Sequence, residues 1–295
     1  MISFDFVSRR NVWFSLSTLL VIASLGILLF NWIVKGSILN FGVEFTGGSV
    51  MVIRFEKKIG EGVSISTIRT ILKEQALQES SIQQVGDFDI SIRTPEMDVD
   101  TRSTILTALR KTIGPVELLE VDTIGPLIGG ELRQQALWGL FWSSLLIMGY
   151  IAVRFEFLYS IAGLLALYHD AIIATGAIAL LGLEVDMAFI AAILTIMGFS
   201  INDTIIIFDR IRENVHKLDP RKYSFSQIVN LSVNQTLPRS INTVLTVLFM
   251  NLMLIVFGGA TIKIFALTLF IGFSVGSYSS IFLAAPFVVS LKRAK

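Results

Sequence analysis

The feature that most constrains this sequence is a set of six long apolar runs, each long enough to cross a lipid bilayer as a helix. They are residues 12–34, 136–153, 157–183, 187–208, 240–262 and 264–291. Crossing the hydrocarbon core takes roughly 20 helical residues. Only 16% of the 295 residues are charged, whereas soluble domains carry about 25%. The sequence therefore predicts a bundle of six membrane helices, the last of which must bend or end near Pro286.

The counts of reactive residue types exclude several kinds of site. The sequence holds no cysteine, so disulfides and thiolate metal sites are excluded. Its two histidines, His169 and His216, are too few and too scattered for a histidine-rich metal site. The formal net charge of +1 gives no indication of a nucleic-acid partner. We therefore expect neither a bound metal nor a nucleic acid.

Nucleotide chemistry is not indicated either. Neither Gly47-Gly48 nor Gly258-Gly259 has the spacing and the lysine of a phosphate-binding loop. We expect a protein that is not an enzyme and holds no cofactor, driven by an ion gradient or by a partner ATPase. The first apolar run is too long for the core of a signal peptide, so we also expect no cleaved leader.

The lysines and arginines of the short loops predict the orientation, because such cations stay in the cytoplasm. They gather at both termini, after the second run and between the fourth and fifth runs. These cations are Arg9, Arg10, Arg154, Arg210, Arg212, Lys217, Arg221, Lys222, Arg239, Lys292, Arg293 and Lys295. The short loop 182–186 has none. We therefore expect a multi-pass protein with both termini in the cytoplasm and residues 35–134 outside.

Residues 35–134 are predicted to form a folded extracytoplasmic domain. Apolar spacing predicts strands at 50–55, 82–85, 88–92 and 116–121, and helices at 64–76 and 100–113. This β-α-β-β-α-β order is typical of the ferredoxin-like fold. Four carboxylates of the domain are interpreted as solvated turn and cap residues: Asp87, Asp89, Asp98 and Asp100.

The predicted fold class is thus a membrane all-α six-helix bundle with an inserted α+β ferredoxin-like domain. We place the N-terminus and the first membrane helix in residues 1–34, and the inserted domain in residues 35–134. Residues 135–295 hold the second to sixth membrane helices, with a cytoplasmic loop at 209–238.

Asp203 is the most informative ionisable residue, because it lies inside the fourth apolar run. A charge at mid-bilayer costs about 2.5–3.5 kcal/mol on insertion scales, so such residues are candidates for function. Asn202 lies near its helical face. A carboxyl group that alternates between burial and the neighbourhood of a cation can take up and release a proton. The alternative is a structural group that hydrogen-bonds another helix.

Two other polar positions leave two interpretations each. Arg239 opens the fifth run, with Thr243 one turn later, and it either extends to the cytoplasmic headgroups or turns inward to pair with Asp203. Asp170 in the third run either joins a proton path or hydrogen-bonds a neighbouring helix. Its neighbour His169 is interpreted as a packing residue.

Two further patterns predict local structure. Gly272, Gly276 and Ser280 form a small-residue ladder that favours a close helix contact, within the chain or with a partner. Ser224 and Gln227 match a capping box, and the apolar spacing after them predicts an amphipathic helix on the cytoplasmic membrane face. Its positions are Phe225, Ile228, Val229 and Ser232. Asp209, Arg210, Arg212 and Glu213 are interpreted as solvated or paired along the helix.

Several ordered motifs resemble the SecF branch of the SecD/SecF protein-export family. They are residues 198–214 (GFSINDTIIIFDRIREN), 239–243 (RSINT), 276–282 (GSYSSIF), 169–170 (HD) and 42–48 (GVEFTGG). Glu44 stands where the family usually has aspartate, which keeps the charge and lengthens the side chain. The resemblance covers almost the whole length and implies membership of the resistance-nodulation-division superfamily.

The resemblance also implies function. Members of the family pair with six-helix SecD, assist the SecY-SecE-SecG translocon in the cell inner (plasma) membrane, and are thought to use the proton-motive force to pull exported preproteins outward. YajC and YidC are further expected partners, together with membrane lipid. The aspartate matching Asp203 and the arginine matching Arg239 are implicated in proton conduction, which favours the inward interpretation of Arg239.

Two rival functions remain at the level of the sequence. A small-molecule efflux pump of the same superfamily normally carries two six-helix halves and two outer domains, and this chain has one of each. A scaffold that only stabilises the translocon has no need of an aspartate inside the membrane, so Asp203 counts against it.

Overall fold

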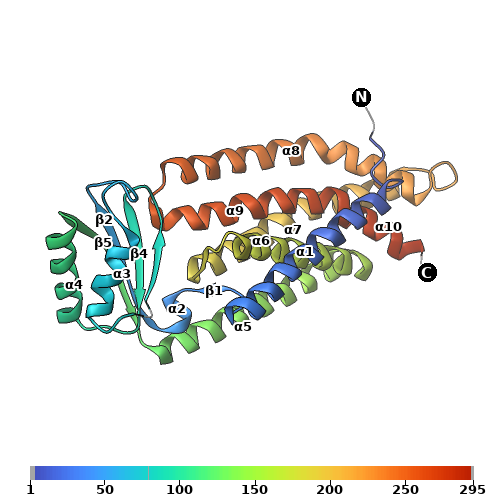
Figure 1. Cartoon of the computed structure of the whole chain (residues 1–295). Helices are drawn as coiled ribbons and strands as arrows, with labels where there is room; N and C mark the ends of the chain where they lie inside the picture. The colour runs from blue at the N-terminus through green and yellow to red at the C-terminus, as the bar shows by residue number, and fades with distance from the viewer. Residues whose placement is uncertain (1–3, 79, 294–295) are drawn as a thin grey trace. The chain divides into compact units, whose positions relative to one another are not determined.

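The computed structural model describes residues 4–78 and 80–293 (Figure 1). The chain forms two compact units: residues 1–40 together with 138–295, and residues 41–137. The first unit contains the predicted membrane bundle and the second contains most of the predicted outer domain.

Long helices make up the first unit, and six helical stretches of the described chain are long and apolar enough to cross a membrane. The helices are α1 (Arg10–Lys35), α5 (Pro126–Arg154), α6 (Phe157–Leu180), α7 (Met187–Lys217), α8 (Phe225–Phe257) and α9 (Ala260–Ser279). A π-helical segment, η1 (Ser280–Ala284), joins α9 to α10 (Ala285–Arg293). The prediction of six spans is confirmed at this level. Two short strands, β1 (Asn40–Phe41) and β6 (Glu184–Val185), pair with each other, and the short helix α2 (Val43–Thr46) belongs to the second unit.

Three of the helices extend beyond the apolar runs that predict them. α5 begins at Pro126, so residues 126–134 are helical rather than part of the outer domain's loops; proline favours the first helical position because its missing N–H needs no partner there. α7 continues to Lys217 and α8 begins at Phe225. The predicted loop 209–238 is therefore non-helical only at 218–224. Charged residues end an apolar run, but they do not end a helix.

The junction of the fifth and sixth runs was also predicted in the wrong place. The apolar run continues to residue 262, but α8 ends at Phe257, where Gly258 is the C-cap. Gly259 then serves as the N-cap of α9. Near Pro286 the predicted change does occur: the helix widens into η1 immediately before the proline, which has no N–H to donate.

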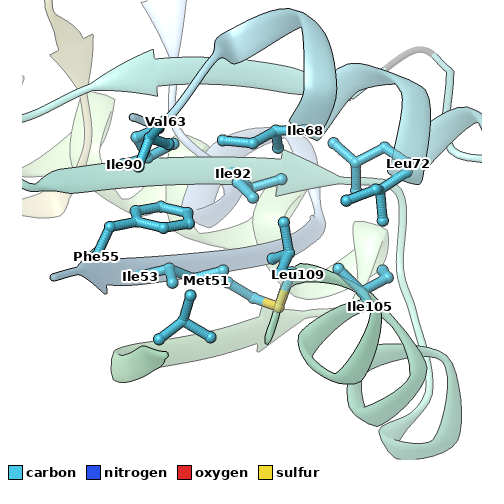
Figure 2. Close-up of a cluster of buried hydrophobic side chains, with 12 residues drawn as sticks. Met51, Ile53, Phe55, Val63, Ile68, Leu72, Ile90, Ile92, Ile105 and Leu109 are labelled. Atoms are coloured by element: carbon cyan, nitrogen blue, oxygen red, sulfur yellow. The ribbon is translucent and has the colours of Figure 1, made fainter. Parts of the chain in front are cut away.

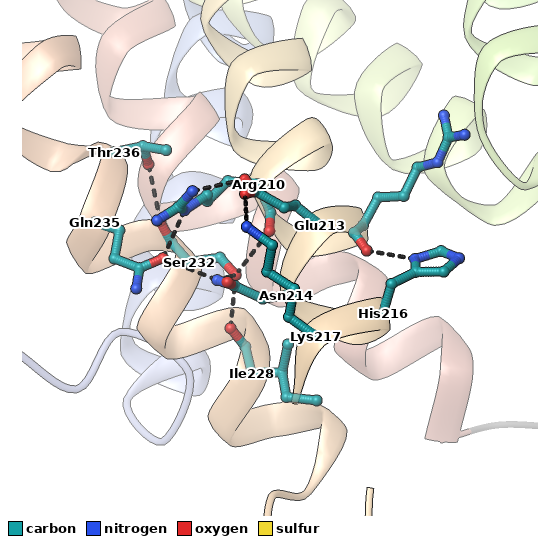
Figure 3. Close-up of polar contacts among 10 residues, drawn as sticks. Arg210, Glu213, Asn214, His216, Lys217, Ile228, Ser232, Gln235 and Thr236 are labelled. Atoms are coloured by element: carbon teal, nitrogen blue, oxygen red, sulfur yellow. Dashed lines mark hydrogen bonds and ion pairs between the residues drawn. The ribbon is translucent and has the colours of Figure 1, made fainter. Parts of the chain in front are cut away.

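The predicted amphipathic helix after Ser224 is the first part of α8 rather than a separate surface helix. The capping box is confirmed, because the side chains of Ser224 and Gln227 each bond the other's backbone N–H. Ile228, Val229 and Ser232 are buried within the protein, so their face packs on the protein and not on lipid. Ser232 accepts a hydrogen bond of 2.8 Å from Asn214 of α7 (Figure 3).

The second unit is built on a four-stranded antiparallel sheet in the order β3-β4-β2-β5. Its strands are β2 (Gly48–Phe55), β3 (Ser81–Gln84), β4 (Asp89–Thr94) and β5 (Val116–Ile124), and its helices are α3 (Ile65–Glu74) and α4 (Val99–Thr112). The chain order is the β-α-β-β-α-β order that the sequence predicts.

The core of this unit lies between one face of the sheet and the two helices (Figure 2). Met51, Ile53 and Phe55 alternate along β2, and successive strand residues point to opposite faces. Ile92 of β4 is opposite Met51 in the register. Side chains of α3 and α4 cover this face: Ile68, Ile71, Leu72, Ile105 and Leu109. Apolar alternation in the strands and helical spacing in the helices thus produce one shared core.

The interpretation of the outer carboxylates is right for Asp98 and wrong for Asp89. Asp98 caps α4, and its hydrogen bonds from the side chain and backbone N–H of Thr101 hold the pKa of that carboxyl below its usual range. Asp89 is buried and accepts two hydrogen bonds from Arg54, at 2.8 and 3.0 Å. This paired carboxylate raises the pKa of Arg54. A strand position next to a turn is not always solvated.

Candidate proton-coupling site

Asp203 lies on the buried face of α7, where only 5% of the residue is exposed. Its Oδ1 accepts a hydrogen bond of 2.6 Å from the hydroxyl of Ser240 on α8. Its Oδ2 is buried and has no hydrogen-bond partner among the residues that the structure describes. A buried ionised oxygen without a partner is unfavourable, so this oxygen is suited to carrying a proton or to meeting a mobile cation.

Arg239 immediately precedes Ser240 on α8, and its side chain is exposed. Within residues 4–78 and 80–293 it forms no ion pair with Asp203. It lines a pocket of about 360 Å³ between α7 and α8, together with Asp209, Arg210 and Thr236. Arg239 is therefore adjacent to the serine that bonds Asp203, but its guanidinium does not contact the carboxylate. The inward pairing that the resemblance favours stays a prediction.

The two supporting polar residues of this region are not bonded to Asp203. Asn202 is exposed, whereas its neighbour Asp203 is buried. Thr243 donates its hydroxyl hydrogen bond, 2.9 Å long, to the carbonyl of Arg239 in its own helix. Asn202 is next to Asp203 in sequence and Thr243 is one helical turn after Arg239, but neither side chain bonds the Asp203 carboxylate among the described residues.

Asp170 forms the centre of a second buried cluster. Its Oδ2 accepts hydrogen bonds of 2.7 Å from Ser200 on α7 and of 2.7 Å from Ser279 on α9. Its Oδ1 lies 2.9 Å from Nδ1 of His169. Asp170 thus joins α6 to two neighbouring helices, and hydroxyl donors satisfy one carboxylate oxygen while the imidazole meets the other.

His169 completes this cluster. Its ring is buried, and Nε2 has no partner among the described residues. The ring centroid lies 6.2 Å from that of Tyr278, whose hydroxyl donates to the carbonyl of Trp13 at 3.1 Å. His169 therefore both packs, as the sequence indicates, and bonds Asp170.

Hydroxyl groups lie between the two aspartates. Thr204, next to Asp203 in sequence, has its Oγ1 2.9 Å from Oγ of Ser280 in η1. Ser280 in turn donates to the carbonyl of Ser200, at 3.2 Å, and Ser200 donates to Asp170. The π-helical segment thus bonds two residues of α7, Ser200 beside the Asp170 cluster and Thr204, the sequence neighbour of Asp203, and π-helical turns are frequent at functional sites.

The small-residue ladder makes the predicted close contact, and it does so within the chain. A Cβ on Gly272 would lie 2.1 Å from Cδ1 of Ile196, and one on Gly276 would lie 3.1 Å from Cβ of Ser200. The absence of side chains at these positions lets α9 approach α7 closely enough for Ser279 to reach Asp170.

Sequence reasoning missed the hydroxyl partners of the two aspartates. Ser240 directly follows Arg239, and Ser279 lies three residues after Gly276, on the same helix face. The sequence offers one signal for each serine: Ser240 is next to a charged residue, and Ser279 shares a helix face with a small packing residue. As for metals, the described residues contain no group of three or more histidine, cysteine, aspartate or glutamate side chains able to hold an ion.

Comparison with protein families gives two matches. Residues 104–294 match the model of the protein export membrane protein SecD/SecF, C-terminal region, and residues 39–59 match that of the SecD/SecF GG motif. The first match alone covers more than half of the chain.

Curated proteins and solved structures agree with these matches. The chain is 41% identical to protein translocase subunit SecF of Sebaldella termitidis over 290 residues, covering 98% of this chain and 92% of that protein. It is 37% identical to that of a Synechocystis species, covering 94% and 90%. Among solved structures it resembles SecDF, a translocon-associated membrane protein from Thermus thermophilus, with a TM-score of 0.88 and 35% identity.

A structure of SecDF in a super-membrane-facing form is also similar, with a TM-score of 0.71 and 34% identity. The alignments cover 99% and 100% of this chain, respectively. The chain spans only 39% of the length of either SecDF chain, so each of those proteins contains much that this chain does not.

Proposed function

The chain belongs to the SecD/SecF family of protein export membrane proteins, and we propose that it acts as the SecF-type subunit of the Sec export machinery. In this role it pairs with a SecD-type protein and assists the SecY-SecE-SecG translocon, with YajC and YidC as further partners. It uses the proton-motive force to drive late translocation of preproteins. Its similarity to translocase subunits supports a transport role rather than catalysis.

The observation that carries the proton-coupling part of the proposal is the unpartnered Oδ2 of Asp203, buried in an apolar helix. In the protonated state the carboxyl group is neutral and tolerates this environment. In the ionised state it needs a counter-charge or water. Arg239 is the nearby candidate counter-charge, because its neighbour Ser240 already bonds the same carboxylate.

Coupling then follows from movement of α8 against α7. Arg239 does not lose its proton at any working pH, so it acts only by position. Near Asp203 it stabilises the ionised carboxylate, and turned into the 360 Å³ pocket it leaves the carboxyl group to be protonated. Each protonation state thus favours one helix arrangement, which is the requirement for linking proton uptake to a conformational change.

We also propose the setting in which this occurs. The chain lies in the inner membrane with both termini in the cytoplasm, as the distribution of lysine and arginine supports. The second unit faces outward as a ferredoxin-like domain, which its β-α-β-β-α-β order and antiparallel sheet support. The proton is the coupling ion, and no other cofactor takes part.

The test is Asp203→Asn in the complex of the chain with its SecD-type partner and the translocon, reconstituted in vesicles. The asparagine keeps the shape and the bond to Ser240 but cannot titrate. We expect it to abolish the gradient-dependent part of export and leave assembly intact. Arg239→Met should impair export similarly, and Arg239→Lys should retain part of it.

Asp219→Asn is the matched control, because Asp219 is exposed in the connection between α7 and α8 and its side chain accepts a hydrogen bond from the backbone N–H of Arg221, which an asparagine oxygen also accepts. Export by the complex that carries Asp219→Asn should respond to the proton gradient as export by the unaltered complex does. Normal gradient-driven export by Asp203→Asn would contradict the proposal and make Asp203 a structural group.

A further inference from the structure

A second pocket lies where α5 ends, α6 begins and the last turns of α7 and α10 meet them. Its volume is about 270 Å³. Four basic side chains and one acidic side chain line it: Arg154, Arg212, His216, Lys292 and Glu156. Phe155, Tyr159 and Val215 supply the apolar part of the lining. None of these residues takes part in the proposed proton coupling.

The pocket has more positive charge than its own carboxylates neutralise. Arg154 pairs with Asp209 at 3.2 Å, and Lys292 pairs with Glu156 at 3.2 Å. Arg212 makes no ion pair among the residues the structure describes, and its guanidinium donates to the carbonyl of Arg154 at 3.3 Å. An arginine that is always charged is thus held at the pocket without a counter-ion.

His216 adds a second group suited to an anion. Its Nδ1 lies 2.7 Å from the carbonyl oxygen of Arg212 (Figure 3). Because a carbonyl only accepts hydrogen bonds, Nδ1 carries the proton, and Nε2 has no hydrogen-bond partner among the residues that the structure describes. When the ring is protonated this nitrogen becomes a donor as well.

The surface beside the pocket is strongly apolar. Val153 and Phe157, which flank the pocket's residues in sequence, are 91% and 64% exposed. Tyr150, one turn earlier on α5, is 56% exposed. A soluble anion gains nothing from such groups, whereas the acyl chains of a lipid do. The cations and the apolar surface together match a molecule with an anionic head and apolar chains.

We propose that this pocket binds the phosphodiester headgroup of an anionic phospholipid, with Arg212 as its main charge contact and the acyl chains along the exposed faces of α5 and α6. Basic pockets between membrane helices on the cytoplasmic side are suited to such headgroups. The lipid fills the space between four helix ends and so holds them together.

The experiment titrates the purified full chain with lipid in detergent and counts bound lipid by native mass spectrometry. The probes are dioleoylphosphatidylglycerol and dioleoylphosphatidylcholine, which have the same acyl chains and differ in charge. We expect preferential binding of phosphatidylglycerol. Arg212→Gln should weaken it about fivefold, the effect of one surface cation. Arg221→Gln, which removes an exposed cation outside the pocket, should leave it unchanged.

Four results would overturn the proposal. The first is equal binding of the two lipids by the unaltered chain. The second is equal weakening by Arg212→Gln and Arg221→Gln. The third is displacement of phosphatidylglycerol by equimolar inorganic phosphate, which would indicate a site for a soluble anion. Arg212→Lys keeps the charge and should retain most of the preference; a complete loss there would show that charge is not the basis of binding.

Discussion

At the scale of single residues, the two buried aspartates of the bundle differ in how fully they are bonded. Asp203 has one hydroxyl partner and an unpaired oxygen. Asp170 has two hydroxyl partners and an imidazole. A carboxylate with an unpaired oxygen can change between its protonated and ionised states without breaking a hydrogen bond there. A carboxylate whose oxygens are both hydrogen-bonded favours a fixed structure. We therefore interpret Asp170 as the group that holds α6, α7 and α9 together.

This difference predicts unequal losses of stability. Asp170→Ala leaves the hydroxyl of Ser200 and the ring of His169 without their acceptor, while Ser279 keeps the carbonyl of Gly276 at 3.1 Å. Asp203→Ala leaves one hydroxyl, that of Ser240, without its acceptor. Each buried polar group that loses its partner costs about 1–3 kcal/mol. We expect Asp170→Ala to lower the free energy of unfolding by about 2 kcal/mol more than Asp203→Ala does. Thermal unfolding of the two variants in the same detergent measures this, and equal melting temperatures would contradict it.

The aspartates were predictable from the sequence, and their partners were not. A carboxylate stands out in an apolar run because it is costly there. Hydroxyls do not stand out, because most of them satisfy themselves within their own helix. Thr268 and Ser274 do so, each bonding the carbonyl four residues earlier at 2.8 Å. Only the packing of the helices distinguishes Ser240, which bonds Asp203, from such residues.

At the scale of elements, apolar runs predicted the number of long helices and misplaced several ends. α7 has 31 residues, and at 1.5 Å per residue it is about 46 Å long. The hydrocarbon core is about 30 Å thick, so the apolar run records the membrane's thickness and not the helix's length. In the second unit the elements are short and their periodicity spans each whole element, so the predicted bounds fall close to the observed ones.

One helix contact predicts a sharp effect of a single methyl group. A Cβ on Gly176 of α6 would lie 2.4 Å from Cβ and 2.8 Å from Cα of Ser24 on α1. Because the second atom is backbone, α1 must move. We expect Gly176→Ala to lower the free energy of unfolding by about 1–3 kcal/mol, the usual effect of overpacking.

Gly139→Ala on α5 is the control for this substitution, because a Cβ there meets nothing within 4 Å. Alanine favours helix over glycine by about 1 kcal/mol, so this variant should be neutral or more stable. Thermal unfolding again compares the two. If both variants are equally stable, α1 does not pack on α6 as closely as described.

The N-terminal segment before α1 is bonded to α8 through two asparagines. Asn234 accepts from the N–H of Phe4 at 3.0 Å and donates to its carbonyl at 2.9 Å. Asn230 accepts from the N–H of Phe6 at 2.8 Å, and Phe6 is buried. The side-chain amides thus act on this segment as a neighbouring strand would.

Loss of these amides should release the segment. We expect the double variant Asn230→Ala, Asn234→Ala to raise the rate of tryptic cleavage at Arg9 severalfold, since each lost hydrogen bond removes about 1 kcal/mol of local stability. Asn251→Ala is the control, because the amide nitrogen of Asn251 donates only within α8, to Val247. Mass spectrometry of the cleaved chain measures the rate, and unchanged cleavage in the double variant would show that the segment is held by its aromatic contacts instead.

At the scale of the whole molecule, both ends of the described chain lie at the same end of the bundle (Figure 1). Phe4 bonds α8 near its start, and Nζ of Lys292 lies 4.6 Å from the ring centroid of Phe225. The connection 218–224 and the cations Arg221 and Lys222 belong to this end as well. An even number of spans requires both termini to lie at the same end of the bundle. The cations at this end predict that it faces the cytoplasm.

The orientation itself is open to a direct test, because the chain contains no cysteine and a single introduced one is the only reactive thiol. Asp87 in the second unit and Lys217 at the end of α7 are matched sites, with side chains 67% and 68% exposed. A membrane-impermeant maleimide added to intact cells should label Asp87→Cys and should label Lys217→Cys only after the membrane is opened. Because the two side chains are equally exposed in the protein, a difference in their labelling reports on which side of the membrane each one lies. Labelling of Lys217→Cys in intact cells, with protection of Asp87→Cys, would invert the topology and with it the direction of the proton transfer that we propose for Asp203.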